Sequence, residues 1–438
     1  MAADGRAAEA EPPAIPLNTP AQFADPADVA AVLGRQHHAI AANPPYIVPP
    51  TAAARDAYRA RYESAYMRFS LGAVFTERLF ELLVPGGWVA QLTANSFMKR
   101  EFGKPLVEKV LPRYDLTHVI DTSGAFIPGH GTPTVILVAR NRAPSSDKVR
   151  CVMGRRGEPE TPQGLTPFGI TMGKLLKRAI GGAADALSPG AQLEAREAAL
   201  RTAGLWAVTI ALAATVRWRA DTLGAAMPPS AAPLAEVGAW CAEALPGMGW
   251  LDPCETINPA WRAPLPRDAE QTLVAAVHAA LPPPSPETDW VGDLLEALDE
   301  ASVKRHAFCQ TPRFVRDFLL NLSLDPALLE FGLDGLSFLD PACGSGHLLV
   351  DAFWRLYYAR ALHFGDGVPH APHADAALHA LEAVHGGDLN PQVVALARAR
   401  LVLAYLDAAG WHAGERVPRD VPLRVVCADA LLAHRPPG

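Results

Sequence analysis

The stretch GLSFLDPACGSGHLL, residues 335–349, joins a hydrophobic run to two closely spaced glycines. The run GLSFLD predicts a buried strand that ends at Asp340, and the residues from His347 onward predict a long helix. Gly344 and Gly346 lack a Cβ atom, so the backbone between strand and helix is free to turn sharply and a ligand is able to approach it closely. The amino end of the helix offers N–H groups and a positive dipole end to an anion. A ligand-binding loop is therefore predicted at this strand end.

Two more strands are predicted downstream, and each ends at an acidic residue. The strand in AVHGGDLN ends at Asp388, which is placed to hold ribose hydroxyls, and the strand in PLRVVCADAL ends at Asp429, which is placed to accept a hydrogen bond from an adenine amine. Open α/β sheets bind ligands outside the carboxyl ends of their strands. We therefore expect three binding positions along one edge, although the glycine spacing is not the G-x-G-x-x-G of a dinucleotide fingerprint.

The whole chain divides into two sets of alternating strands and helices, separated by a region rich in alanine. We expect a flexible lead-in over residues 1–30, a first α/β set over 31–142, a linker and helical region over 143–285, and a second α/β set over 286–438. This alternation predicts a mostly parallel sheet that is covered on both faces.

Two helices are predicted within the first set. SLGAVFTERLFELLV, residues 70–84, is amphipathic and is followed by Pro85, Gly86 and Gly87, which form a stop signal. KPLVEKVLPRY, residues 104–114, predicts the second helix.

Composition limits the class of protein. Half of the 438 residues are hydrophobic, 19% are charged and the net charge is −7, which indicates a globular chain that is not strongly basic. The six cysteines contain no C-x-x-C pair, which argues against structural zinc and disulfides and favours the cytoplasm. The amino-terminal residues lack the features of a signal peptide, and the apolar run Gly204–Val216 is too short to span a bilayer, so a buried helix and no membrane contact are expected. The five histidines between His363 and His385 are interpreted as a surface insertion, and no metal site is predicted.

The glycine loop resembles that of a known family. The letters DPACGSGHLL, followed by DLNP, resemble the S-adenosylmethionine loop of DNA amino-methyltransferases. Upstream, HAFCQTPRFVRDFLL resembles the segment in which a Thr-Pro pair at a helix start lies against the methionine end of the cofactor, with Pro312 at the first helical position. The cofactor-binding residues predicted on this basis are Phe308, Thr311, Pro312, Asp340, Pro341, Ala342, Gly344, Gly346, Asp388, Asn390 and Asp429.

A second motif, NPPY, resembles the catalytic motif of adenine N6-methyltransferases and comes directly after the predicted strand HHAIAA. The exocyclic amine of adenine is a poor nucleophile, and fixed acceptors around its two hydrogens orient it for attack. The Asn43 side-chain oxygen and the Pro44 carbonyl are two such acceptors, and Pro44 and Pro45 remove N–H donors and fix φ. Tyr46 is predicted to stack on a base that has left the duplex. A proline-rich loop without chemistry is the alternative.

Further segments resemble the same enzymes. LTANSFMKREFGKPL and HVIDTSGAFIPGHGTPTVILVARN are similar to the segments downstream of this motif in large restriction–modification enzymes. The family resembled is the adenine-specific (N6) DNA methyltransferases of phage-growth-limitation (BREX) type, over about residues 30–160 and 288–432. The resemblance implies a Rossmann-like, doubly wound α/β sheet, the cofactor S-adenosylmethionine, double-stranded DNA with a flipped adenine as substrate, and other defence-system proteins as partners. The basic cluster Lys99, Arg100, Lys104 and Lys109 is interpreted either as phosphate contacts or as a solvated helix face.

The order of the two motifs is reversed relative to that family, in which the cofactor half comes first. A circular permutation with an inserted helical region and a gene rearrangement that leaves activity in doubt both explain this order. A methyltransferase that acts on RNA or protein glutamine, and an inactive subunit that binds S-adenosylmethionine or DNA, also stay open.

Overall fold

The computed structural model describes most of the chain. The described residues are 25–123, 132–154, 170–190, 192–223, 228–229, 232–245, 247–280, 291, 294, 311–364, 373–410 and 421–434. Of the predictions above, Phe308 and most of the lead-in lie outside these residues.

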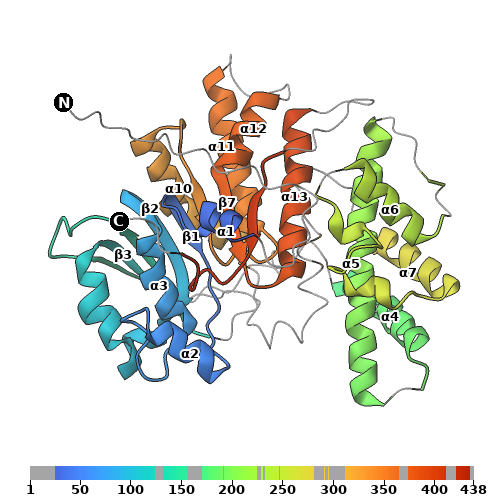
Figure 1. Cartoon of the computed structure of the whole chain (residues 1–438), viewed down its shortest axis with the longest axis horizontal. Helices are drawn as coiled ribbons and strands as arrows, with labels where there is room; N and C mark the ends of the chain where they lie inside the picture. Colours follow the sequence, from blue (N-terminus) through green and yellow to red (C-terminus); the bar gives the residue numbers. More distant parts are fainter. Residues whose placement is uncertain are drawn as a thin grey trace, which may run out of the picture.

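One eight-stranded sheet contains strands from both α/β sets (Figure 1). Its order is β5-β3-β4-β2-β1-β6-β7-β8, and only the pairs β2·β4 and β3·β4 are antiparallel. The sets meet where β1 and β6 pair in parallel, with Ala39 opposite Phe338 and Ile40 opposite Leu339. The predicted mostly parallel sheet is therefore confirmed. The strands are β1 (His37–Ala42), β2 (Leu83–Ala94), β3 (Asp115–Asp121), β4 (Thr134–Arg140), β5 (Arg150–Met153), β6 (Phe338–Asp340), β7 (Val384–Asp388) and β8 (Arg424–Cys427).

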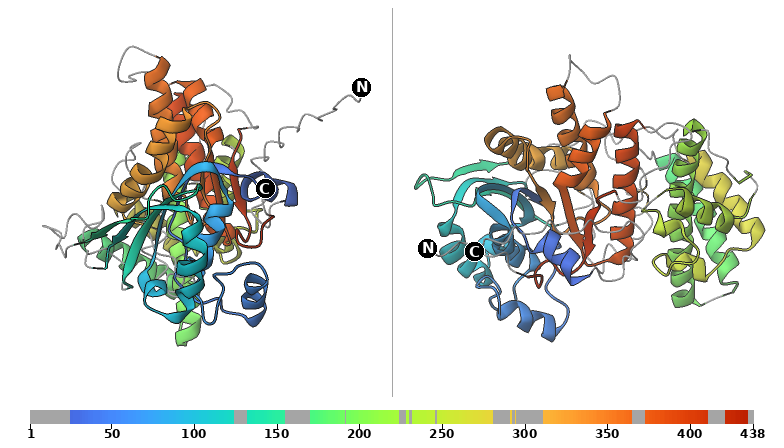
Figure 2. Two further views of the ribbon diagram at one scale, coloured as in Figure 1. Left: turned by 90° about the vertical axis from the view of Figure 1, so that its left-hand side faces the viewer. Right: turned by 45° about the horizontal axis from the view of Figure 1, so that its top comes forward.

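Helices cover both faces of the sheet (Figure 2). Side chains of a strand alternate between the two faces, and β1 shows this directly. Ala39 and Ala41 belong to the core under α10, α11 and α13, whereas Ile40 and Ala42 belong to the core under α1 and α3. These helices are α1 (Pro26–Leu33), α3 (Leu71–Glu81), α10 (Arg313–Phe331), α11 (His347–Phe364) and α13 (Pro391–Ala409).

The structure corrects both helices predicted in the first set. α3 ends at Glu81, and the Pro-Gly-Gly stop signal lies within β2. Gly86 has φ +82°, and its carbonyl accepts hydrogen bonds from the Arg140 guanidinium, so the irregular start of this strand is held in place. The segment 104–114 forms a short π-helix, Leu106–Val110, and a 3₁₀ turn, because Pro112 cannot donate a backbone hydrogen bond to an α-helix.

Two other segments also differ from the sequence interpretation. Part of the predicted polar linker forms β5, which pairs in parallel with β3 at the edge of the sheet. The histidine-rich segment contains α12 (Ala374–Ala383), which packs against α11 and α13, and His385 is buried in β7. The described part is therefore not a surface insertion. Within the described residues no group of three His, Cys, Asp or Glu side chains converges as a metal site would require.

The alanine-rich region is helical, as predicted, and lies beside α13 (Figure 1). Trp206 and Trp261 pack edge to face in its core, with ring centroids 4.7 Å apart, and the buried Gly204–Val216 run lies within α5. By length and composition alone, one described helical stretch, Leu193–Arg217, would reach across a bilayer, but most of it is buried in the protein, so this is weak evidence. The helices are α4 (Ile170–Leu187), α5 (Leu193–Leu223), α6 (Leu234–Ala244) and α7 (Arg267–Ala280).

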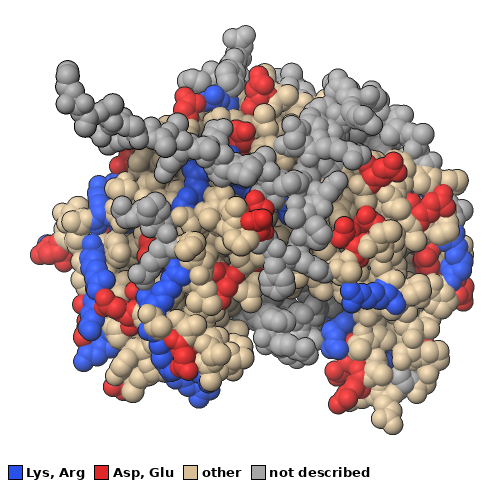
Figure 3. All heavy atoms as spheres, in the orientation of Figure 1, with Lys and Arg blue, Asp and Glu red and all other residues tan. Residues whose placement is uncertain are grey.

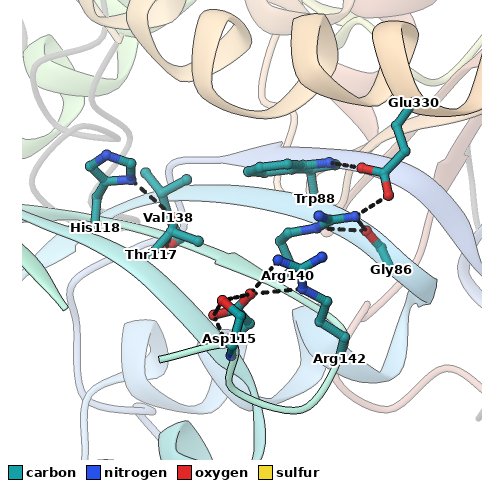
Figure 4. Close-up of polar contacts among 10 residues, drawn as sticks. Gly86, Trp88, Asp115, Thr117, His118, Val138, Arg140, Arg142 and Glu330 are labelled. Atoms are coloured by element: carbon teal, nitrogen blue, oxygen red, sulfur yellow. Dashed lines mark hydrogen bonds and ion pairs between the residues drawn. The ribbon is translucent and has the colours of Figure 1, made fainter. Parts of the chain in front are cut away.

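A polar cluster fixes the far end of α10 at the amino end of β2 (Figure 4). Arg140 stacks on the Trp88 ring, with its guanidinium carbon 4.5 Å from the ring centroid, and forms an ion pair with Glu330. The Trp88 indole N–H also donates to Glu330, at 3.1 Å. Because both ends of α10 are held, its first residue keeps a fixed place at the opposite edge of the sheet.

Candidate active site

The NPPY turn begins where β1 ends, at the carboxyl edge of the sheet. The Asn43 amide Nδ2 donates to Thr311 Oγ1 at 3.0 Å, and the Tyr46 hydroxyl donates to Asn43 Oδ1. Two hydroxyl groups therefore fix the orientation of this amide. A carbonyl oxygen has two lone pairs, so Oδ1 keeps one for a further donor. Asn43 and Thr311, which the sequence assigned to different halves of a site, are in direct contact.

Thr311 is held from the cofactor side. Its carbonyl accepts a hydrogen bond from Arg316 Nη1 at 2.9 Å, and Arg316 Nε donates to Asp351 of α11 at 2.6 Å. Pro312, with φ −55° and ψ 147°, is the residue before α10, so its predicted place as the first helical residue is wrong. The extended backbone at Pro312 turns Thr311 away from the helix and toward Asn43.

Asp340 ends β6 and lies almost completely inside the protein. Its Oδ1 accepts a hydrogen bond from the Ala342 N–H at 3.1 Å, which shapes the Pro341–Ala342 turn. Burial, together with the nearby negative charge of Asp388, raises the pKa of this carboxyl to about 8. A carboxyl with so high a pKa carries a proton at neutral pH for much of the time, which lets it donate as well as accept.

Glycine is needed at two positions of the loop for different physical reasons. Gly344 has φ +53°, and its N–H donates to Asp388 Oδ2 at 3.0 Å. Gly346 has φ +88°, and a Cβ atom there would lie 2.8 Å from the Cβ of Ala397 in α13. The close approach at Gly346 is therefore to a neighbouring helix, whereas the sequence analysis expected a ligand.

Asp388 and Asn390 organise the next strand end. Asp388 Oδ1 accepts from the Asn390 N–H at 2.9 Å, while its other oxygen accepts from the glycine loop. Asn390 caps α13, because its Oδ1 accepts from the Gln392 N–H at 2.9 Å. Between them, the Leu389 side chain is 66% exposed and offers an apolar surface.

β8 ends at Cys427, two residues before the predicted end at Asp429, and Asp429 contacts the first α/β set. Its Oδ2 accepts from the Tyr58 hydroxyl at 2.8 Å, and its Oδ1 accepts from the Leu431 N–H at 2.9 Å. Burial and the Asp429 charge raise the pKa of Tyr58, so the phenol stays protonated and donates. Tyr58 belongs to α2 (Ala52–Arg59), which comes after the NPPY turn.

Three polar residues at this edge were missed by the sequence analysis. Arg400 of α13 is buried and donates to the carbonyl and hydroxyl of Ser345, which clamps the glycine loop. Asn95 follows β2 and is buried, and its Nδ2 has no partner among the described residues. Tyr58 is the third. Only Asn95 carried a usable signal, namely an asparagine directly after a strand, as at Asn43.

Four adjacent parallel strands thus present polar side chains at one edge. β1, β6, β7 and β8 pair in sequence and in parallel, so Asn43, Asp340, Asp388 and Asp429 follow one another along their carboxyl ends. Their carboxylates and the Asn43 oxygen form a set of acceptors. A hollow of about 410 Å³, lined by Ala60, Arg61, Leu432 and His434, adjoins this row beyond Asp429 and contains none of the predicted site residues.

The predicted cationic cluster is exposed but does not lie on one helix. Lys99 and Arg100 lie in the turn between two short 3₁₀ segments after β2, Lys104 follows the second of these, and Lys109 lies in the π-helix. Glu101 and Glu108 lie among them. The four side chains therefore do not share one α-helix face, although all are exposed, and phosphate contact stays a prediction.

A mostly parallel sheet, with helices on both faces and its polar residues at the carboxyl edge, defines an open-sheet α/β protein. Within this chain, residues 19–127 match the family model described as Eco57I restriction-modification methylase. The match covers NPPY and most of the first α/β set.

Named relatives agree with this match. Over 192 residues, the chain is 35% identical to adenine-specific methyltransferase PglX of Streptomyces coelicolor. The aligned segment covers 40% of this chain and 16% of that protein. Over 113 residues, it is 33% identical to type II methyltransferase M.XhoI of Xanthomonas vasicola. This aligned segment covers 24% of this chain and 20% of that protein. The resemblance to adenine-specific methyltransferases is confirmed. The matched segments span a fifth or less of these relatives.

A solved structure also aligns with this chain. It is a modification subunit of a putative type I restriction enzyme from Vibrio vulnificus YJ016, with a TM-score of 0.35 and 15% identity over 59% of this chain and 56% of that one. A similarity of this size supports no conclusion.

Proposed function

We propose that this chain transfers a methyl group from S-adenosylmethionine to the exocyclic N6 amine of adenine in DNA. The observation that carries the proposal is the hydrogen bond between Asn43 Nδ2 and Thr311 Oγ1, because it joins the acceptor turn to the cofactor half. Relatives named as methyltransferases support the same reaction. When bound, S-adenosylmethionine supplies a methyl group on a positively charged sulfur.

Asn43 and Pro44 act on the amine. The free lone pair of Asn43 Oδ1 and the Pro44 carbonyl accept the two N6 hydrogens, which orients the amine lone pair and makes it more nucleophilic. The amine lone pair forms the new N–C bond while the C–S pair leaves with sulfur. The surplus amine proton then leaves to water, so a general base is not required. Pro45 keeps the turn rigid, and the Tyr46 ring stacks on the base.

The acceptors at the strand ends match the donors of the cofactor, which are an ammonium group, ribose hydroxyls and an adenine amine. Asp388 is assigned to the ribose and Asp429 to the adenine amine, because these carboxylates follow the neighbouring parallel strands β7 and β8 at the carboxyl edge of the sheet. Asp340, Thr311 and Pro312 face the methionine end. Pro341, Ala342, Gly344 and Gly346 form the loop, and Asn390 holds the helix behind it.

We also propose that the two α/β sets are halves of one domain in permuted order. If the chain is read from β6, β7 and β8 into β1 and β2, the spatial order of these strands is 3-2-1-4-5, as in doubly wound folds. The helical region 143–285 then bridges the halves. The resemblance further implies a cytoplasmic enzyme of host DNA modification in phage defence, with other defence proteins as partners.

Asn43→Ala tests the reaction. We expect methyl transfer to phage and host DNA, followed with radiolabelled S-adenosylmethionine, to fall about 10²–10³-fold, as when one preorganised hydrogen-bonding group is removed from an active site. Calorimetry should show an S-adenosylmethionine affinity within about twofold of the unchanged protein, since no direct contact with the cofactor is removed. Asn321→Ala, at an exposed asparagine of α10 that binds Arg355, is the matched control and should leave both quantities unchanged.

The unchanged protein decides between the remaining functions. Cofactor binding without transfer to any DNA would contradict the proposal and favour an inactive binding subunit. Transfer to RNA or to protein glutamine, with none to DNA, would favour the alternative substrates.

A further inference from the structure

The loop between α2 and α3 exposes two large apolar side chains at its tip. Tyr66 is 43% exposed and Met67 is 49% exposed. Met67 has φ +53° and is the one residue other than glycine with a positive φ within the described ranges. A bulky side chain seldom adopts this conformation, and such outliers cluster at functional sites.

The base of the loop is firmly held on both sides of this tip. Before it, the Tyr62 hydroxyl donates to the Leu431 carbonyl, and the Ser64 N–H donates to Glu77 of α3 at 2.8 Å. After it, Phe69 is completely buried. Arg59 Nη2 donates to the Met67 carbonyl at 2.9 Å, which fixes the tip itself. The two apolar side chains are thus presented to solvent by a rigid support.

The tip lies close to the acceptor turn. The Leu71 N–H donates to the Ile47 carbonyl at 2.8 Å, and Ile47 is the residue directly after NPPY. The tip is four to five residues before Leu71, and the helix that leads into the loop is tied through Tyr58 to Asp429. The loop therefore borders the same edge of the sheet as the candidate active site.

Cations surround the tip. Arg59 and Arg68 flank it and are exposed, and Arg113, also exposed, reaches the loop through an ion pair with Glu63 at 2.7 Å. In Figure 3, Lys and Arg side chains lie beside acidic ones over the part of the surface that contains α2, and Arg59 forms an ion pair with Asp56. An apolar tip flanked by exposed arginines matches a nucleic-acid duplex, which presents phosphates outside and base faces inside.

We propose that Tyr66 and Met67 form a wedge that enters the base stack of duplex DNA and fills the space that the target adenine leaves as it rotates toward Asn43. This inference rests on the proposed function and extends it to how the duplex is opened. Moving a base out of a duplex costs stacking and pairing energy, and an inserted apolar side chain offsets that cost. A rigid tip loses little conformational freedom when it inserts.

The test compares two DNA pools of random sequence around one adenine. In the first pool the adenine is paired with thymine, and in the second it lies opposite an abasic position, where little opening is needed. We expect the variant Tyr66→Ala/Met67→Ala to bind the paired pool at least about tenfold more weakly than the unchanged protein, and the abasic pool within about twofold. Fluorescence anisotropy gives both affinities, and methyl transfer to each pool should show the same pattern.

Two further variants control the result. Leu329→Ala/Tyr358→Ala removes exposed side chains of similar kind from α10 and α11 and should change neither affinity. Tyr66→Ala/Met67→Gly removes the wedge with a residue that accepts a positive φ, so it reports on the wedge even if the alanine variant unfolds early.

The outcomes are distinct. Equal weakening for both pools, no weakening, no DNA binding by the unchanged protein, or a change of oligomeric state in the variant would each overturn the wedge. A further outcome is that the double variant loses binding to the paired pool alone while the unchanged protein transfers no methyl group. That result would support the wedge and contradict the proposed reaction.

Discussion

The turn after β1 and the loop after β6 lie on neighbouring strands, yet they hold their polar side chains in different ways. Asn43 in the turn is held by hydroxyl groups of other side chains. Asp340 and Asp388, in contrast, accept hydrogen bonds from backbone N–H groups of Ala342 and Gly344 in the loop. At the turn, a substitution should therefore change chemistry and leave the fold intact. At the loop, it should change both together.

The largest combined effect on stability and cofactor affinity is expected at Asp388. Asp388→Ala leaves the partly buried N–H groups of Gly344 and Asn390 without their acceptor, which should cost, for each group, the lower part of the range of about 1–3 kcal/mol for a buried group. We expect the free energy of unfolding in urea to fall by about 2–4 kcal/mol and S-adenosylmethionine affinity to fall at least about tenfold. Asp325→Ala, which removes an exposed ion pair with Arg355, is the control and should cost less than about 1 kcal/mol. Lost affinity with unchanged stability would remove the contrast between loop and turn.

Asp340 should make stability depend on pH. Folding raises its pKa from 3.8 to about 8, so the stabilising effect of the protonated carboxyl is complete below pH 3.8 and is lost as the pH rises through 8. Asp340→Asn keeps the acceptor for the Ala342 N–H but cannot ionise. Between these pH values, the unchanged protein should lose up to about 1.4 kcal/mol per pH unit relative to the variant. Parallel urea midpoints at several pH values measure this difference, and equal slopes would contradict it.

The smallest effect is expected at Thr311. Thr311→Val keeps the shape of the side chain and removes the hydroxyl that binds Asn43 Nδ2. We expect methyl transfer to fall about tenfold, because the amide is less well oriented, while unfolding free energy changes by less than about 1.5 kcal/mol. Thr311→Ser restores the hydroxyl and should recover transfer. If Thr311→Ser does not recover methyl transfer, the loss is due to the methyl group of Thr311 and not to its hydrogen bond with Asn43. The difference drawn between the turn and the loop would then be contradicted.

The sequence predicted where three of the central strands end, because the hydrophobic runs stop at Asn43, Asp340 and Asp388, whereas β8 ends two residues before Asp429. A run of buried side chains must end where a polar group reaches the sheet edge. The helix after the glycine loop was equally clear. The same logic predicted a mostly parallel sheet covered on both faces.

Contacts between distant residues were not predictable from local patterns. Tyr58 and Asp429 are 371 positions apart, and nothing in either segment names the other. The role of Gly346 depends on Ala397 in another helix. At Gly86, the local stop signal lies in an irregularity of β2, between the residues that pair with His37 and Ala39 of β1, and the Gly86 N–H donates to the Asn141 carbonyl. In each case tertiary packing decided what a local window leaves open.

β1 cannot pair with β6 until the ribosome has synthesised β6, so the centre of the sheet forms late. Ala39 and its partner Phe338 are 299 positions apart. At about 5–20 residues per second, a ribosome needs roughly 15–60 s to make that intervening chain. Throughout that interval β1 has a free edge of backbone N–H and C=O groups, which is a template for wrong pairing. Expression yield should thus depend on chaperones that cover this edge until the second half of the protein emerges.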